Sequence, residues 1–182
     1  MKDLDNSLIL YSVYGNLEGV KDVLLRGANI NTPQAGSTPL YEAVSKGNIE
    51  IVDELLKSNN IETGKYDSST GYAALHAAVF YSFYCNREML LQRLLVDPRF
   101  DIRIPSNAPL TIGFTPLHIA AYIGYNNGIE LLIKAGARPS DLTADSKLSV
   151  YDIAGKSNSC TKSSTELIEF IDKLLLDKFT IY

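Results

Sequence analysis

The stretch GFTPLHIAAYIGYNNGIELLIKAGA, residues 113–137, decides how the chain folds. Its Thr115-Pro116 pair is typical of a helix start, because a threonine hydroxyl caps free backbone N–H groups and proline has no N–H to lose at the first helical position. Gly124 and Gly136 stand where helices end. The stretch therefore predicts two helices joined by a tight turn. Helices this short are not stable alone in water, so the unit needs neighbours.

The same pattern recurs along the chain. Copies begin at positions 38, 73 and 149, which places the copies 34 to 42 residues apart, and a degenerate copy occupies residues 6–12. Each copy is followed by an apolar segment with the three- and four-residue spacing of an amphipathic helix. Such units indicate a stack of repeats in which each unit buries its apolar side against the next.

Two segments identify the kind of repeat. Residues 115–121 read TPLHIAA and residues 27–31 read GANIN. They resemble the ankyrin repeat, in which Thr-Pro-Leu-His-x-Ala-Ala precedes a glycine and an apolar helix, and Gly-Ala-Asp-x-Asn closes the unit. The resemblance implies an all-α ankyrin-repeat solenoid of about five helix-turn-helix repeats with finger-like turns. It implies a single domain over residues 1–182, with approximate repeats at 4–36, 37–71, 72–113, 114–147 and 148–182.

Three segments depart from the pattern and are expected to be lengthened loops. Residues 80–88 lack a glycine between the two helices of the third unit, residues 104–113 lengthen a finger, and residues 156–164 form a polar insert before the last helix. Solenoids tolerate insertions on surface loops. The first and last units are rich in polar residues, as units with one side open to water should be, so the array is expected to be complete within the chain.

Composition narrows the class of partner. The net charge is −4 and the pI about 5.2, which argues against nucleic acid and against an acidic membrane surface. No apolar run reaches the roughly 18 residues that a membrane span needs, and no secretory signal is visible. We therefore expect neither nucleic acid nor membrane as a partner. We expect a cytoplasmic location, which would be the host cytoplasm for a secreted bacterial or viral effector.

Few residues could carry chemistry. His76 and His118 both occupy the histidine of the repeat pattern, where the resemblance implies a structural link between adjacent turns. Cys85 and Cys160 are too few and too far apart for a disulfide framework or a zinc site, and are expected to be free thiols. No glycine-rich phosphate loop and no acidic cluster for calcium or magnesium is visible. We expect no catalytic residues, no metal and no cofactor.

A partner is expected on the concave face that such stacks present. By analogy with the family, this face exposes the positions after the Ala-Ala pair and those beside the glycine before Thr-Pro. Here these positions hold many aromatic residues, which are enriched at interaction hot spots. The alternative is that several rings fill gaps between repeats. The predicted partner-binding residues are Tyr14, Lys46, Tyr72, Phe80, Tyr81, Phe83, Tyr84, Phe114, Tyr122 and Ile123.

The sequence thus predicts a protein–protein interaction module that binds an unidentified protein, as a monomer, and acts as adaptor, inhibitor or effector without catalysis. Two alternatives from other classes stay open. One is an enzyme or catalytic effector that uses Cys85, which would need a positioned histidine and a lowered thiol pKa. The other is a structural module that associates with itself and would be a dimer in solution.

Overall fold

The computed structural model of the chain describes residues 2–34, 36–85, 87–154 and 164–179. Within these ranges the chain forms ten helices, and its only β pairing consists of two isolated bridges. The helices are α1 (Lys2–Tyr14), α2 (Leu17–Leu25), α3 (Pro39–Lys46), α4 (Ile49–Leu56), α5 (Ala74–Cys85), α6 (Glu88–Leu95), α7 (Pro116–Ile123), α8 (Asn126–Lys134), α9 (Val150–Ala154) and α10 (Ser164–Phe179).

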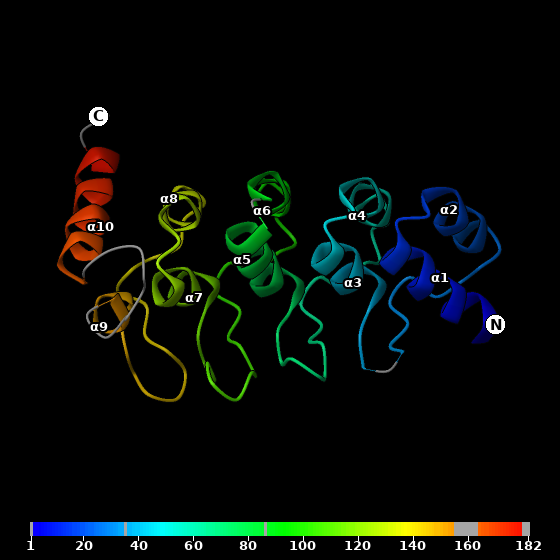
Figure 1. The fold of residues 1–182 in the computed structure, drawn as a ribbon, viewed down its shortest axis with the longest axis horizontal. Coiled ribbons are helices and arrows are strands. Elements are labelled where there is room, and N and C mark those ends of the chain that lie inside the picture. The colour runs from blue at the N-terminus through cyan, green and yellow to red at the C-terminus, as the bar shows by residue number, and fades with distance from the viewer. Residues whose placement is uncertain (1, 35, 86, 155–163, 180–182) are drawn as a thin grey trace.

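The helices stand in pairs along an elongated stack, with α1 and α10 at opposite ends (Figure 1). The first helices of the pairs, α1, α3, α5, α7 and α9, form an inner row, and the second helices form an outer row. Finger-like loops extend from the inner row, away from the outer row, between successive pairs. We call the surface made by the inner row and the fingers the inner face. The all-α ankyrin-type solenoid predicted from the sequence is confirmed.

Local residue chemistry sets the ends of the helices, as α7 illustrates. The hydroxyl of Thr115 accepts from the backbone N–H of His118, and the His118 ring accepts in return from the Thr115 N–H, 3.2 Å from Nδ1. Pro116 is the first helical residue. Gly124 ends the helix in the left-handed region, with a φ of 73° that a side chain would disfavour. The predicted start and stop of this helix are both confirmed.

Small side chains let the inner helices pack closely. Alanines are buried where the inner helices meet, at Ala43 in α3, Ala77 and Ala78 in α5, and Ala120 and Ala121 in α7. Larger aliphatic residues fill the space between the two rows, among them the fully buried Leu55, Leu94 and Leu132. Because each helix pair covers the apolar side of its neighbour, the core runs through the stack instead of lying at one centre.

The fingers are joined to one another through their backbones. In each case the carbonyl of a finger glycine accepts a hydrogen bond from an N–H of the next finger. The three bonds are Ser68 N–H to Gly36 (2.8 Å), Asn107 N–H to Gly71 (2.9 Å) and Ala144 N–H to Gly113 (3.2 Å). All three glycines have positive φ, between 75° and 85°. A methyl group at Gly71 would lie 2.5 Å from the backbone nitrogen of Ala108, so no larger residue fits there.

The third residue of each central inner helix also reaches the finger that follows. The three links are Tyr41 Oη with Thr70 Oγ1 (2.9 Å), His76 Nε2 with the Ile104 carbonyl (3.0 Å) and His118 Nε2 with the Asp141 carbonyl (3.0 Å). Both histidines therefore connect adjacent turns, as the sequence predicted for them.

The prediction of an expanded loop over residues 80–88 is wrong. α5 continues to Cys85 and α6 begins at Glu88, so the segment is mostly helix. It contains no glycine or proline to end the helix, and the rings of Phe80 and Tyr84, one turn apart, stack with centroids 5.9 Å apart. Residues 104–113 do belong to a finger. The predicted insert at 156–164 lies outside the described residues, except that Ser164 begins α10.

Replacing Gly71 by alanine should destabilise the fold more than replacing Gly27. Both glycines have positive φ, +75° and +90°, but Gly27 has nothing within 4 Å of the new methyl group whereas Gly71 touches the next finger. Strain alone should lower the free energy of unfolding by about 1 kcal/mol for Gly27→Ala. With the added clash, Gly71→Ala should lower it by about 3 kcal/mol or more. Urea unfolding measures both, and equal losses would contradict the close approach of the fingers.

Candidate functional site

The inner face carries most of the predicted partner-binding residues. Tyr84 at the end of α5 is 65% exposed, Tyr122 in α7 is 48% exposed, and Tyr14 at the end of α1 is 79% exposed. Lys46, the last residue of α3, is exposed as well. The other predicted rings are half-buried and also pack against the core, namely Tyr72, Phe80, Tyr81, Phe83 and Phe114. Exposed rings therefore stand beside rings that contribute to packing.

Most of these rings form two groups. In the first, centroid distances are 5.3 Å for Tyr72–Phe80, 5.9 Å for Phe80–Tyr84 and 4.9 Å for Phe83–Tyr84. In the second, Phe114 and Tyr122 meet edge to face with centroids 6.1 Å apart. One of these pairs is stacked, one is tilted and two are edge to face, and stacked and edge-on pairs are the arrangements that aromatic rings prefer. The predicted strip is thus two clusters, one on α5 and its finger and one on α7.

The prediction that Ile123 is exposed on this face is wrong. Ile123 is only 9% exposed and belongs to the core. It lies one helical turn after the fully buried Ile119, so it shares the buried side of α7. Among the described residues, no ring contact joins Tyr14 to either cluster and no ion pair holds Lys46.

A cavity of about 260 Å³ opens beside the first cluster. Five aromatic side chains line it, and we call it the five-ring pocket. They are Tyr41, Tyr72, Phe80, Tyr81 and Tyr84, with Thr70, Ala77 and Cys85 completing the lining. Tyr41 comes from α3, so the pocket lies between two neighbouring units.

Sequence reasoning missed Tyr41, which links the pocket to a charged group. Its hydroxyl donates to Thr70 Oγ1 (2.9 Å), because the Thr70 proton is used in a bond to Asp67 Oδ1 (2.8 Å). Burial raises the pKa of Tyr41 to about 12, and nearby carboxylates add to this. Burial alone would raise the pKa of Asp67, but hydrogen bonds from Ser69 and Thr70 outweigh it and lower that pKa. Tyr41 could have been recognised from the sequence, because it occupies the position that histidine holds in the Thr-Pro-Leu-His pattern of the repeat.

Cys85 lines the same pocket from the last residue of α5, and its side chain is exposed. A thiol nucleophile requires a neighbouring base. His76, on the same helix, is fully buried. Its Nδ1 accepts from the Ala73 N–H and its Nε2 bonds to the Ile104 carbonyl. Both ring nitrogens are therefore engaged away from the thiol.

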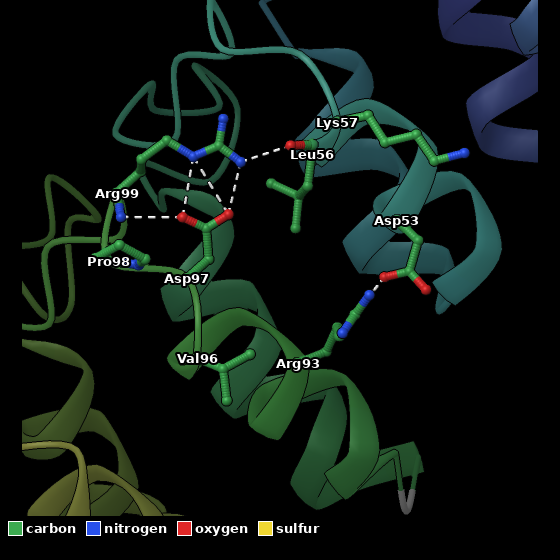
Figure 2. Close-up of a pocket in the computed structure, with 8 residues that line it drawn as sticks. All are labelled: Asp53, Leu56, Lys57, Arg93, Val96, Asp97, Pro98 and Arg99. Carbon is green, nitrogen blue, oxygen red and sulfur yellow. Dashed lines mark hydrogen bonds and ion pairs between the residues drawn. The ribbon is translucent and has the colours of Figure 1, made fainter.

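The outer row holds a second and larger cavity, of about 460 Å³, between α4 and the end of α6 (Figure 2). The side chains of Leu56 and Val96 face into it, and ion pairs stand at its edges. Arg93 pairs with Asp53 at one edge, and Arg99 pairs with Asp97 (2.6 Å) at the other. Since its charged edges are already paired within the chain, this outer groove offers a ligand little uncompensated charge.

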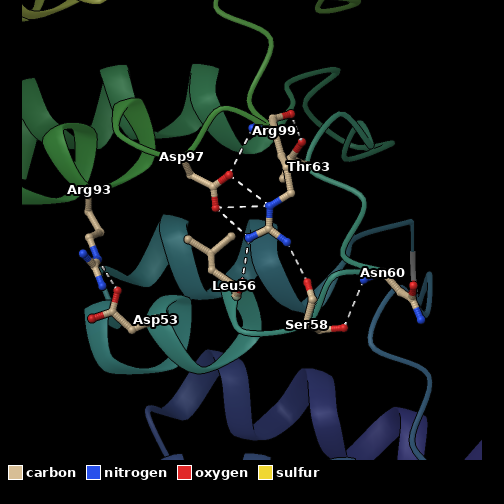
Figure 3. A network of polar contacts seen from close by, with 8 residues as sticks. All are labelled: Asp53, Leu56, Ser58, Asn60, Thr63, Arg93, Asp97 and Arg99. Atoms are coloured by element: carbon tan, nitrogen blue, oxygen red, sulfur yellow. Dashed lines mark hydrogen bonds and ion pairs between the residues drawn. The ribbon is translucent and has the colours of Figure 1, made fainter.

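Arg99 acts as a clasp between the second and third units (Figure 3). Its guanidinium donates to the carbonyls of Leu56 and Ser58, both at 2.6 Å, at the end of α4. α2 and α8 end differently, with Gly27 and Gly136 at positive φ, a glycine cap that satisfies the last carbonyls. α4 has no such glycine, and Arg99 supplies the missing donors from the next unit. The absent glycine after Leu56 shows in the sequence that α4 lacks its usual cap, but α6 also ends without a glycine, so this signal does not point to Arg99.

Neither a metal site nor a membrane-spanning helix has support in the part of the chain that the structure describes. No group of three or more histidine, cysteine, aspartate and glutamate side chains there could hold a metal ion. None of the helices described combines the length and apolar character that a bilayer crossing requires.

Comparison with known families accounts for the helix pairs. The profile for ankyrin repeats in three copies matches residues 8–105, and the single ankyrin-repeat profile matches residues 112–144. The chain belongs to the ankyrin-repeat family. Ankyrin repeats are generally protein–protein interaction modules. The matches extend through the fourth helix pair, and α9 and α10 lie beyond them.

Two human proteins are similar to part of this ankyrin array. The transient receptor potential cation channel subfamily A member 1 of Homo sapiens is 37% identical over 103 residues, which are 56% of this chain and 8% of that protein. The ankyrin repeat domain-containing protein SOWAHD of Homo sapiens is 32% identical over 101 residues, 56% of this chain and 30% of that protein. The chain spans much less than two thirds of either relative, so the likeness is one of repeats.

The ankyrin histidine His76 should make stability depend on pH. Burial lowers its pKa to about 4 from the usual 6.5. The unfolded chain therefore binds a proton that the folded chain does not between these two values, so stability falls as the pH drops below 6.5. We expect the free energy of unfolding to be about 2 kcal/mol lower at pH 5.0 than at pH 7.5. In the variant His76→Gln the free energy of unfolding should fall less between pH 7.5 and pH 5.0. If NMR showed that His76 titrates near pH 6.5 in the folded chain, the prediction would be contradicted.

The two arginines of the outer groove should differ in their effect on stability. Arg99→Met removes the donors to two carbonyls and should lower the free energy of unfolding by about 2 to 3 kcal/mol. Arg93→Met breaks an exposed ion pair and should cost at most about 1 kcal/mol. Urea unfolding of the two variants at neutral pH gives the comparison. A loss for Arg99→Met no greater than that for Arg93→Met would show that Arg99 is not a clasp.

Proposed function

We propose that the chain binds a protein partner through its inner face and acts by binding, without catalysis. The observation that carries this proposal is the pair of exposed rings, Tyr84 and Tyr122, each resting on a second aromatic ring of the same face. Exposed aromatic side chains of this kind bury a large area when covered and lose little conformational entropy, because they rotate about two bonds only.

Rigidity of the scaffold supports the proposal. The exposed rings stand on helices, and the helices are joined through the finger backbones and through buried contacts to both neighbours. A surface held in this way needs little ordering on association, which favours affinity. The half-buried rings, such as Phe83 against Tyr125 at 5.6 Å, also fill space between units, so only part of the predicted strip is assigned to binding.

The engagement of both His76 ring nitrogens away from Cys85 supports action without chemistry. We propose the roles of adaptor, inhibitor or effector on the same ground, because each requires a surface only. The monomeric state and the cytoplasmic location expected from the sequence stay predictions, as does the identity of the partner.

Removing the two exposed rings should strongly reduce capture of partner proteins. The double variant Tyr84→Ala/Tyr122→Ala is compared with wild type by quantitative pull-down from cell extract. Partners that bind the inner face should be recovered at least about tenfold less, since hot-spot rings are worth about 1.4 kcal/mol or more. The fold should be retained because neither side chain is buried in the core, and circular dichroism checks this.

The matched control is Leu25→Ala/Met89→Ala, which removes two exposed apolar side chains, 89% and 71% exposed, from the outer helices α2 and α6. This variant should retain every partner. If the inner-face variant captured the same partners as wild type, or if the outer variant lost them instead, the proposed binding face would be refuted. Light scattering measures whether the wild type is a monomer. If the wild type is a dimer and the inner-face variant is a monomer, the inner face would be assigned to self-association.

A further inference from the structure

The five-ring pocket has a lining that suits a cation better than an aliphatic side chain. Five of its eight lining residues are aromatic, and one, an alanine, is aliphatic. The rings come from α3, from the finger before α5 and from α5 itself, so they face the cavity from more than one element. The faces of aromatic rings carry partial negative charge and attract cations placed within about 6 Å of the ring centre.

Negative charge stands behind one wall of the pocket. The hydrogen-bond chain from Tyr41 through Thr70 ends on the carboxylate of Asp67, which polarises the Tyr41 hydroxyl. Glu42, the next residue of α3, also acts electrostatically on Tyr41. The lining includes no lysine or arginine. Lys46 lies five residues beyond Tyr41 on α3, and Arg87, two residues after Cys85, donates to the Ser45 carbonyl at 3.4 Å. The charge around the pocket therefore favours a positively charged occupant.

The hydration of the cation restricts which cation suits the pocket. Tyr41 and Thr70 bond to each other, and the Tyr72 hydroxyl bonds to Thr111 Oγ1 at 3.0 Å. These bonds use hydroxyl protons and leave acceptor lone pairs on the tyrosine oxygens, so the preference depends on hydration: a primary ammonium has three strongly hydrated N–H donors that must leave water. A quaternary methylated ammonium has no N–H and presents charged methyl groups to the rings. The volume, about 260 Å³, is smaller than the roughly 300 to 1,000 Å³ of sites for drug-sized ligands and suits a single group.

We propose that the five-ring pocket binds a quaternary methylated ammonium group carried by a side chain of the protein partner. The inference rests on the proposed function, because it names the chemistry by which that partner would be recognised. A protein side chain is the carrier we choose, because the pocket opens on the same inner face as the exposed rings of Tyr84 and Tyr122.

Choline and 3,3-dimethylbutan-1-ol test the role of charge, since they share one shape and only choline is cationic. Each is titrated into the full chain while the NMR signals of carbon-13-labelled tyrosine rings are followed. We expect saturable shifts at Tyr81 and Tyr84, with a dissociation constant for choline at least about fivefold lower than for the alcohol. Equal or tighter binding of the alcohol would assign the pocket to an aliphatic group, and a lack of saturable shifts with both probes would show that it binds neither.

Two variants separate the contribution of the rings from that of the charge. Tyr84→Leu keeps an apolar side chain but removes an exposed ring, and Glu42→Gln removes a neighbouring charge and leaves every ring in place. Both should weaken choline binding, and Glu42→Gln should leave binding of the alcohol unchanged. Met89→Leu, on the outer helix of the same unit, is the control. Choline affinity unchanged in both pocket variants would overturn the proposal.

The carrier of the group is tested with two short peptides that differ only in trimethyl-lysine against lysine, and with phosphatidylcholine vesicles. About fivefold tighter binding of the trimethyl-lysine peptide is expected. Sedimentation with the vesicles and no preference between the peptides would assign the group to a lipid and overturn the proposal. If partner capture depends on Tyr122 but choline does not bind, this inference alone fails. If choline binds but the inner-face variant captures the same partners as wild type, the proposed function fails.

Discussion

Each helix pair of this chain has an apolar side that only the next pair can cover, and the architecture follows from that constraint. Helices of eight or nine residues, such as α3, α4, α7 and α8, are too short to be stable alone. Stability therefore comes from the contacts between units. These are the packing of buried alanines, one backbone hydrogen bond between successive fingers, and a side chain at the third position of the inner helix that bonds to the following finger. The same contacts that stabilise the stack hold the inner face in one shape.

Features set by a few adjacent residues could be predicted from the sequence. The start of α7 at Thr115-Pro116 and its end at Gly124 depend on capping and on φ alone, so the pattern was sufficient. Residues 80–88 show the limit of such reasoning. A missing glycine has two readings, an insertion or a longer helix, and the choice depends on how Phe80 and Tyr84 pack in three dimensions.

The candidate site was predictable only in part, for a related reason. The exposure of Tyr122 follows from the geometry of the repeat, whereas the exposure of Tyr84 depends on the extension of α5 to Cys85 and the burial of Ile123 on which side of α7 the core covers at its last turn. Tyr41 and Arg99 act through residues 29 to 43 positions away, Thr70 for one and the end of α4 for the other. No pattern within a single repeat contains both partners of such contacts, so only the folded stack reveals them.

The clasp made by Arg99 gives the joint between the second and third units a guanidinium that caps a helix of the neighbouring unit. Here the end of α4 depends on a guanidinium that an aspartate holds in place, and Arg93 and Asp53 add a second charged contact across the same groove. The joint between the third and fourth units is charged as well, because Arg103 pairs with Asp141 there at 2.7 Å. Screening by added salt weakens such contacts, above all the exposed ones. High ionic strength should therefore concentrate local opening at the two joints on either side of the α5–α6 pair.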